Sequence, residues 1–347
     1  MGIVSNPLLT VVVVNWNRRD LLESCLQSLE AQSVSGFEVI LVDNGSTDGS
    51  VNMASCFNNS AKFRLQIVTN SENLGFCAGN NMGIAASRGT FIALLNNDAV
   101  ADPAWLHELS SAFADSAVGM AASKILVFED PSRIDKAGHL IYPDGQNRGR
   151  GTGEVDHGQY NRVEEVLWPD GCAAMYRRSM LDEIGGFDED FFAYADDAEL
   201  GLRARAAGWR CLYIPTAVVR HHRGATLGLA SARRVELIER NRILLTIKHF
   251  PPRMLIASFG YFALRLAAGA WASVHGKGEG KRFPGAGGKL FLAGCIVRAN
   301  LQAVKMVPLM WRKRRALHAL RRLTSSQLRE LLLRHRISLK ALTEQAN

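Results

Sequence analysis

Two aspartates follow apolar runs that are typical of buried strands. Asp43 comes directly after the run 37–42, and Asp98 follows the run 91–95 after two asparagines. Ligands of open α/β sheets bind beyond the carboxyl ends of the strands, so both carboxylates are candidate binding groups. A single aspartate after a strand is more often a turn or helix-cap residue, and Asp43 taken alone fits that role. Asp98 ends a group of three polar residues, and such a carboxylate suits a hard cation that bridges diphosphate oxygens.

A second acidic feature is the adjacent pair Asp196 and Asp197. The segment before it contains Phe191, Phe192 and Tyr194. A carboxylate in a partly apolar pocket has a raised pKa, which suits a general base that works near neutral pH. The alternative is structural, because the macrodipole of a helix also favours acidic side chains in the first turn.

The adjacent histidines His221 and His222 follow an apolar, strand-like run at 217–219. Neutral imidazole is a common metal ligand, which makes the pair a candidate metal site. A histidine pair is more often a surface or core feature, and the pair alone does not decide between these roles.

These candidate residues need a sheet that brings them together. The β-branched run 10–14 does not alternate between polar and apolar residues, which is typical of a strand buried on both faces of a parallel sheet. Strands that alternate with helices predict an α/β fold with right-handed crossovers. Further strands are expected at 37–42, 65–69, 91–95 and 209–215, an ordered segment at 172–177, and helices at 19–29, 79–87, 179–184 and 195–207.

The segment 131–169 is rich in Gly, Asp, Arg and Asn and shows little periodicity. We expect an extended loop region there, of the kind that often carries function. It contains Gly149-Arg-Gly-Thr-Gly153. A glycine-rich phosphate cradle follows a strand and opens a helix. We expect neither around these glycines, so the pattern favours a flexible lid or loop over a phosphate cradle.

The net charge of +8 over 347 residues conceals a split along the chain. Residues 251–347 contain 18 Lys and Arg but 3 Asp and Glu, whereas residues 1–250 contain 23 basic and 30 acidic residues. With 47% hydrophobic residues the chain can fill a core, which excludes global disorder. The six cysteines form no C-x-x-C pair, so we expect free, mostly buried thiols in a reducing compartment. No secretory signal is visible at the N-terminus.

The composition changes after about residue 240. The apolar segment 254–274 contains a single charge, Arg265, and the similar segment 290–311 contains two basic residues on one helical face. The lengths fit membrane spans, but a charge in mid-segment is costly there. The pattern favours helices that lie in a membrane interface, with helices packed on the domain and spanning helices as alternatives. The basic, amphipathic helical tail expected at 312–347 has no aromatic residue to stack on bases, which makes nucleic acid an unlikely partner.

Together the motifs resemble those of the family 2 glycosyltransferases with the GT-A fold over residues 8–227, and most closely those of bacterial rhamnosyltransferase-like members. Each motif alone is weak, but their order along the chain makes the resemblance specific. The matching stretches are Val11-Val-Val-Val-Asn-Trp-Asn17, Val42-Asp-Asn-Gly-Ser-Thr-Asp-Gly49, Asn70-Ser-Glu-Asn-Leu-Gly-Phe76, Gly79-Asn-Asn-Met-Gly83, Leu94-Leu-Asn-Asn-Asp98, Gly185-Gly-Phe-Asp-Glu-Asp-Phe-Phe-Ala-Tyr-Ala-Asp-Asp197 and Arg203-Ala-Arg-Ala-Ala-Gly-Trp209.

The resemblance implies an α/β fold class and two parts. Residues 1–240 are expected to form a GT-A domain, with a single nucleotide-binding, mostly parallel twisted sheet and helices on both faces. Residues 241–347 are expected to form a basic, amphipathic, helical membrane-associating region.

The resemblance also assigns catalytic and metal-binding roles. Asp197 is implied as the catalytic base, and Asp196 stands where the family has a glutamate, so either of the two could act. Asp98 matches the last acid of the family's D-x-D metal motif, whose first acid is an asparagine here. His221 is implied as a second ligand of the divalent metal, Mg²⁺ or Mn²⁺, with Thr226 in the hydroxyl position that follows it.

A larger set of residues near the strand ends is implied to bind the nucleotide-sugar. Asp43 matches the acid that binds the base or the ribose. The segment 203–209 lacks the Q-x-x-R-W signature of processive members, which implies single transfers. The implied nucleotide-sugar-binding residues are Asn15, Asn17, Asp43, Asn44, Asn73, Gly75, Asn80, Asn97 and Asp98.

The resemblance thus implies an inverting, metal-dependent transfer of one sugar, with rhamnose a candidate. The expected donor is a dTDP- or UDP-sugar, and the expected acceptor is a hydroxyl of a lipid-linked or cell-surface glycan. The basic tail suggests a cytoplasmic protein held peripherally on the anionic inner face of the cytoplasmic membrane. The alternatives are a non-catalytic glycan-binding or scaffold protein of the same fold, a nucleotidyltransferase and a nucleic-acid binder.

Overall fold

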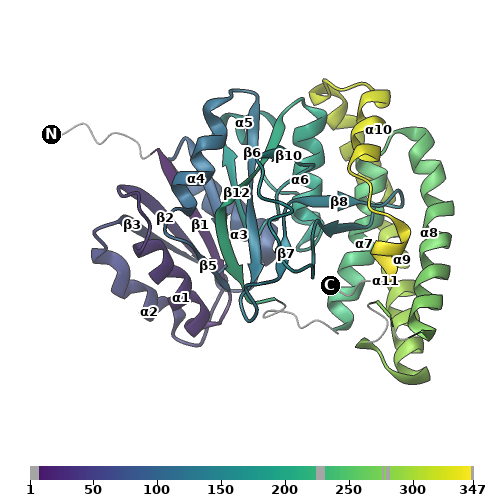
Figure 1. The fold of residues 1–347 in the computed structure, drawn as a ribbon, viewed down its shortest axis with the longest axis horizontal. Helices are drawn as coiled ribbons and strands as arrows, with labels where there is room; N and C mark the ends of the chain where they lie inside the picture. Colours follow the sequence, from purple (N-terminus) through teal and green to yellow (C-terminus); the bar gives the residue numbers. More distant parts are fainter. Residues whose placement is uncertain (1–7, 224–230, 276, 279–281, 345–347) are drawn as a thin grey trace.

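The computed structural model describes residues 8–223, 231–275, 277–278 and 282–344 (Figure 1). Every strand and helix predicted between residues 10 and 215 is present, although α3 begins earlier and β12 continues to His221. The first elements are β1 (Leu9–Asn15), α1 (Arg19–Glu30), β2 (Phe37–Asp43), α2 (Ser50–Ala54), β3 (Phe63–Thr69), α3 (Gly75–Ala86) and β4 (Phe91–Leu95). They are followed by β5 (Ala99–Ala101), α4 (Trp105–Ser111), β6 (Val118–Val127), β11 (Ala173–Arg177), α5 (Arg178–Ile184), α6 (Asp196–Ala206) and β12 (Arg210–His221).

The expectation of an extended loop at 131–169 was correct only in part. The segment contains four short strands, β7 (Ile134–Lys136), β8 (His139–Ile141), β9 (Asn147–Gly149) and β10 (Glu164–Glu165). Each has two or three residues, which is too short to produce a recognisable periodicity. The glycine-rich stretch leaves β9 in a tight turn in which Gly151 and Gly153 have φ angles of 78° and 81°. The turn opens no helix, and Gly151 packs closely against Tyr160.

The long strands form one mixed, mostly parallel sheet in the order β10-β12-β6-β11-β4-β1-β2-β3. β1 lies between β2 and β4 and is parallel to both, which places Asn15 opposite Asp43. β11 is antiparallel to β4 and to β6. The carboxyl ends of β1, β2 and β4 therefore meet at one edge of the sheet, where ligands of open α/β sheets bind.

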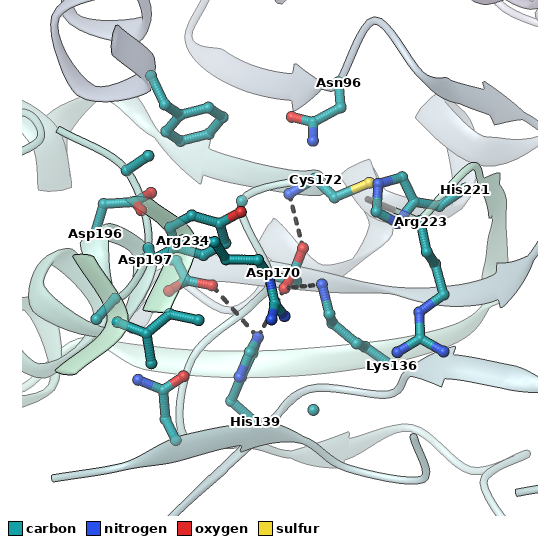
Figure 2. Close-up of a pocket in the computed structure, with 18 of the residues that line it drawn as sticks. Asn96, Lys136, His139, Asp170, Cys172, Asp196, Asp197, His221, Arg223 and Arg234 are labelled. Carbon is teal, nitrogen blue, oxygen red and sulfur yellow. Dashed lines mark hydrogen bonds and ion pairs between the residues drawn. The ribbon is translucent and has the colours of Figure 1, made fainter. Parts of the chain in front are cut away.

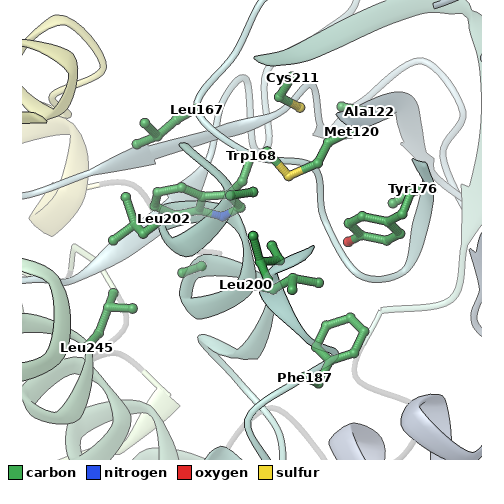
Figure 3. Close-up of a cluster of buried hydrophobic side chains, with 14 of the residues drawn as sticks. Met120, Ala122, Leu167, Trp168, Tyr176, Phe187, Leu200, Leu202, Cys211 and Leu245 are labelled. Atoms are coloured by element: carbon green, nitrogen blue, oxygen red, sulfur yellow. The ribbon is translucent and has the colours of Figure 1, made fainter. Parts of the chain in front are cut away.

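Helices cover both faces of this sheet and produce two core layers, as predicted. One layer contains buried side chains of α1, α2 and α4. The other contains side chains of α5, α6 and α7 (Ala232–His249), with Trp168, Leu202 and Leu245 in one cluster (Figure 3). Gly201 allows α6 to approach this cluster, since a Cβ there would lie 2.2 Å from Cβ of Trp168.

The C-terminal region packs on the domain as four helices, α8 (Pro252–Val274), α9 (Gly285–Ala316), α10 (Ser325–Arg334) and α11 (Leu339–Glu344). The chain between α10 and α11 pairs with the end of β8 at one parallel bridge, where the amide of Ile337 donates to the carbonyl of Ile141 at 3.1 Å. The expected domain boundary at residue 240 lies within α7 and stays a prediction. Two helical stretches, Pro252–Val274 and Gly285–Leu320, are long and apolar enough to cross a membrane.

Two arginines in the middle of these apolar helices pair with α7, Arg265 from a partly buried position and Arg298 from an exposed one. Arg265 of α8 forms a bidentate pair with Glu239 of α7, at 2.8 Å for each contact, and a 2.6 Å contact with Asp144. Arg298 of α9 lies 2.6 Å from Glu236 of α7. The surface of α8 and α9 that is exposed is largely apolar. Its exposed side chains include Ile256, Phe259, Trp271 and Val274 on α8 and Leu290, Val297, Leu301 and Val304 on α9.

A buried charge network joins α6 to α7. Glu199 of α6 is fully buried and contacts Arg203 at 2.7 Å, Lys248 at 2.6 Å and His249 at 3.0 Å. Burial alone would raise the pKa of Glu199, but these three neighbours lower it well below its ordinary value. A buried carboxylate with this many partners fixes α6 in place, since removing a partner would leave an uncompensated charge.

The lowered pKa of His249 predicts that the folded protein loses stability in mild acid. Burial lowers the pKa of His249 from 6.5 to about 4, and the hydrogen bond with Glu199 opposes this shift only in part. Between these two values the unfolded chain binds a proton that the folded chain does not. The free energy of unfolding should therefore fall by on the order of 3 kcal/mol as the pH falls from about 6.5 to 4.

Urea unfolding at intervals between pH 7 and 4 measures this loss. The variant His249→Gln, which can still donate to Glu199, should show a clearly smaller loss than the unmodified protein. The control His107→Gln replaces a histidine exposed on α4 and should show the full loss. An equal pH dependence in both variants would contradict the role given to His249.

Candidate active site

A cavity of about 380 Å³ opens at the carboxyl edge of the sheet (Figure 2). Its walls come from the ends of β1, β2, β4 and β12, from the segment between β7 and β9, and from the segment that precedes α6. Arg234 and Arg242 of α7 reach it from the C-terminal side. The site thus combines parts of the chain that lie far apart in the sequence.

Most of the predicted site residues line this cavity. The predicted base and metal residues Asp98, Asp196, Asp197 and His221 all do so, although β4 and α6 are separated by about half of the domain. Thr226 lies outside the described residues. Of the predicted nucleotide-sugar-binding residues, the ones in the cavity wall are Asn44, Asn73, Gly75, Asn97 and Asp98.

The other predicted binding residues do not line the cavity and form hydrogen bonds with neighbouring turns and helices. They are Asn15, Asn17, Asp43 and Asn80. Oδ1 of Asp43 accepts from the amide of Ser46 at 2.9 Å, and Nδ2 of Asn15 donates to the Ser46 hydroxyl at 3.1 Å. The amide of Asn17 donates to that hydroxyl at 2.7 Å, and Nδ2 of Asn80 donates to the carbonyl of Phe76 at 2.9 Å. A direct role of these four residues in ligand binding stays a prediction.

Asp98 and His221 meet at the end of β4 and β12. Nε2 of His221 lies 3.4 Å from Oδ1 of Asp98, and Nδ1 lies 2.8 Å from Asp135. Burial alone would lower the pKa of His221, but Cys172, Asp135 and Asp98 raise it well above its ordinary value. Oδ1 of Asp98 is buried and has no hydrogen-bond partner among the described residues. This place therefore attracts positive charge.

His222 points elsewhere. Its ring stacks on Phe128 with 3.7 Å between the centroids, and its Nδ1 lies 2.7 Å from Glu129. Neither His222 nor these two partners line the cavity. Of the two histidines, His221 is the one in the site.

Asp196 and Asp197 form the first turn of α6 and are almost fully buried. Oδ2 of Asp197 lies 3.3 Å from Nε2 of His139, which in turn lies 2.9 Å from Asp170 (Figure 2). Burial and Asp197 raise the pKa of Asp196 well above its ordinary value. Burial also raises the pKa of Asp197, but His139 and Lys136 oppose the shift. Asp197 is therefore the carboxyl group of the pair that ionises more readily.

Several residues of the site were missed in the sequence. Lys136, His139 and Asp170 interact directly, since Nζ of Lys136 lies 2.6 Å from Asp170. His139, Asp170 and Asp197 are buried and lie close enough to hold a metal ion. Lys136 lies on β7 and His139 on β8. These strands are too short to show a periodicity, so the sequence pattern did not reveal the two residues. The run Pro169-Asp-Gly-Cys172 was a turn signal directly before β11 that could have identified Asp170.

Comparison with known proteins gives several relatives. An N-acetylglucosaminyl-diphospho-decaprenol L-rhamnosyltransferase of Mycobacterium tuberculosis is 28% identical over 243 residues, which cover 64% of this chain and 78% of the relative. The O-antigen biosynthesis protein RfbC of Myxococcus xanthus is 30% identical over 228 residues, or 63% of this chain. The uncharacterized protein y4gI of Sinorhizobium fredii is 27% identical over 237 residues, or 64% of this chain. The chain spans 18% of the length of RfbC and 25% of that of y4gI.

Solved structures show the same architecture. The mannosyltransferase PcManGT of Pyrobaculum calidifontis, in complex with GDP-Man and Mn²⁺, has a TM-score of 0.55 at 19% identity and covers 91% of this chain and 86% of its own. TarS 1–349 of S. aureus has a TM-score of 0.51 at 16% identity and covers 94% of this chain and 90% of its own. These likenesses establish a GT-A fold. Residues 10–185, just over half of the chain, match the family described as Glycosyl transferase family 2, and the chain belongs to that family.

Proposed function

We propose that the protein is an inverting, metal-dependent glycosyltransferase that moves one sugar from a nucleotide-sugar to a hydroxyl group of a lipid-linked or cell-surface glycan. The observation that carries the proposal is the meeting of Asp98, His221 and Asp197 in one cavity of a family 2 GT-A domain. Such a displacement needs one carboxylate that binds a cation and one that acts as a general base, and both lie at one edge of the sheet.

Asp197 acts as the general base. His139 and Lys136 favour its ionised form, whereas Asp196 is held towards its neutral form by burial and by the charge of Asp197. Asp197 removes the proton of the acceptor hydroxyl as that oxygen attacks the anomeric carbon opposite the leaving group. One displacement of this kind inverts the anomeric configuration.

Asp98 and His221 hold the divalent cation, Mg²⁺ or Mn²⁺. The buried Oδ1 of Asp98, which accepts no hydrogen bond from the described residues, and the imidazole 3.4 Å from it fit such a ligand set. When bound, the ion neutralises the charge that develops on the leaving diphosphate. PcManGT, with the same fold, was solved with GDP-Man and Mn²⁺, which supports both a nucleotide-sugar donor and a metal here.

The cluster of His139, Asp170 and Asp197 is less suited to a metal. Lys136 places its ammonium group 2.6 Å from Asp170 and so supplies the positive charge itself. A cation there would also occupy the oxygen of Asp197 that has to accept a proton. The better use of the cluster is to hold Asp197 in place through His139.

The names of the relatives indicate which donor and acceptor classes to test first. The Mycobacterium tuberculosis relative is named for transfer of L-rhamnose to a diphospho-decaprenol-linked sugar, and RfbC is named for O-antigen biosynthesis. A deoxyhexose such as rhamnose on dTDP, with UDP-sugars as the alternative, is the donor class to test first. The corresponding acceptor is a lipid-linked glycan.

The two apolar helices support a location at the membrane that would hold such an acceptor. Arg265 and Arg298 pair with α7 and so keep α8 and α9 against the domain. Their outward side is apolar, with Ile256 and Phe259 exposed by 74% and 73%. A helix pair with this arrangement lies in the headgroup region of a bilayer, and the basic residues of 251–347 favour an anionic cytoplasmic face.

The catalytic assignment predicts that Asp197→Asn removes turnover. Purified protein is incubated with a panel of nucleotide-sugars, an acceptor extract and Mn²⁺ or Mg²⁺, and the release of nucleoside diphosphate is measured. Asp197→Asn should lower the rate by about 10²–10⁴-fold, because the base is lost, while binding of the nucleoside diphosphate stays the same. The control Asp182→Asn changes an exposed carboxylate on α5 and should keep the full rate. Full turnover in Asp197→Asn would refute its role.

The metal assignment predicts a requirement for Asp98. Chelation with EDTA should stop transfer, and added Mn²⁺ should restore it. Asp98→Asn should weaken Mn²⁺ binding by about tenfold or more in calorimetry, since one anionic ligand is lost. Asp102→Asn, which changes a nearby carboxylate paired with Arg220 outside the cavity, serves as the control. Undiminished transfer after exhaustive chelation would rule out the metal requirement.

The membrane assignment predicts that charge on the outer face of α8 prevents binding to lipid. The double variant Ile256→Glu, Phe259→Glu should bind vesicles of phosphatidylglycerol and phosphatidylcholine about tenfold or more weakly in a flotation assay. The control Val163→Glu changes a valine that is 60% exposed away from both helices and should bind normally. Equal flotation of both variants would place the membrane-binding surface elsewhere.

A further inference from the structure

The segment that leads into the two catalytic-site aspartates has an unusual backbone. Phe192, Tyr194 and Ala195 have φ angles of 64°, 67° and 55°. Residues with a side chain rarely adopt this left-handed region, and such conformations persist only where the surroundings impose them. Asp196 follows directly and begins α6. The direction in which Asp196 and Asp197 enter the cavity therefore depends on what holds this segment.

One buried side chain of α7 holds it. Asn241 is fully buried, and its Nδ2 donates to the carbonyls of Phe191 at 2.9 Å, Ala193 at 2.9 Å and Tyr194 at 2.7 Å. Its Oδ1 accepts from Nε of Arg240 at 2.8 Å. The two N–H groups of this carboxamide thus reach three carbonyls, one N–H being shared, and Phe191 accepts from Arg240 as well. The irregular backbone takes these carbonyls out of regular structure, where each would be costly to leave unpaired.

Two further contacts fix the same segment. Nη2 of Arg240 donates to the carbonyl of Phe191 at 3.1 Å. On the other side, the carbonyl of Phe192 accepts from the amide of Phe76 at 2.9 Å, at the start of α3. The Phe192 ring lies so close to Gly75 that a Cβ there would be 2.5 Å away. The segment therefore connects the cavity wall at Gly75 to the acidic pair.

We propose that Asn241 is a positioning residue, which acts on the reaction by holding residues 191–195 in the conformation that directs Asp196 and Asp197 into the cavity. A leucine at this position fills the same space but donates no hydrogen bond, so the left-handed residues are free to relax. The effect on turnover rests on the proposed glycosyl transfer, whereas the effect on the backbone does not.

Hydrogen exchange measured by mass spectrometry tests the backbone effect without a substrate. In Asn241→Leu, peptides covering 189–198 should exchange about tenfold faster or more, because the carbonyl contacts are lost. The matched control is Gln32→Leu. Gln32 is also a fully buried carboxamide, and it donates to the carbonyls of Ser28 and Asp102 in the other core layer. This control should leave exchange at 189–198 unchanged, and unchanged exchange there in Asn241→Leu would overturn the proposal.

Kinetics test the effect on the reaction. Asn241→Leu should lower kcat by about 10²-fold, as expected for a displacement of about 1 Å in the site. The donor KM should change less than about threefold, since Trp16 and Asn44 of the cavity wall follow β1 and β2 and lie outside the segment 191–195. Gln32→Leu should keep kcat within threefold of the unmodified protein at the same temperature. A shared loss of kcat in both variants, or a loss in neither, would overturn the positioning role.

Asn241→Gln provides the conservative comparison and a variant more certain to fold. It keeps the amide donors on a longer side chain, so it should retain more kcat and more exchange protection than Asn241→Leu, and less than asparagine. Equal kcat in Asn241→Gln and the unmodified protein, with fast exchange at 189–198, would show that the conformation of the segment does not govern turnover. If the unmodified protein transfers no sugar from any donor, the proposed function fails, and the exchange experiment still decides the role of Asn241 in the fold.

Discussion

The carboxylates buried around the cavity are the constraint on which the rest of the structure depends. An ionised group removed from water destabilises the fold by several kcal/mol unless cations or hydrogen bonds compensate for it. Asp170 has Lys136, and Glu199 has three positive or polar partners on two helices. Among the described residues, Asp98 contacts one charged side chain, His221, which also contacts Asp135. Asp98 thus has fewer cationic neighbours than Asp170 or Glu199, and it lies where a metal and a diphosphate would meet.

Helix α7 links this site to the C-terminal helices. Its end contributes Lys248 to the charge network under α6, and its middle contributes Asn241 to the segment before the acidic pair. Its outer side pairs Glu239 with Arg265 of α8. One helix thus contacts both the catalytic part and the apolar surface proposed to face the membrane. This explains how Arg265 occurs inside an apolar helix, since its guanidinium group pairs with Glu239 and Asp144 of the domain.

The sequence was sufficient to predict most of the longer strands and the strand ends that carry Asp98 and His221, because long apolar runs and turn residues have strong local patterns. The strand β6, which lies between β12 and β11, was not predicted. Lys136 and His139 could not be predicted, since they lie on three-residue strands whose pairing depends on distant partners. The same holds for Asn241, whose role exists only through carbonyls about fifty residues away. Asp43 and Asn15 show a third case. The resemblance implied ligand contacts for both, and the structure shows that both also hold a turn, so their role in ligand binding stays a prediction.

The position of the metal tests the central claim most directly. Crystals grown with Mn²⁺ and a nucleoside diphosphate can be measured near the manganese absorption edge, where the anomalous difference map locates the ion. We predict a peak within coordination distance of both Asp98 and His221, next to the diphosphate. A peak among His139, Asp170 and Asp197 instead, with none near Asp98, would contradict both the metal assignment and the role of Asp197 as the base.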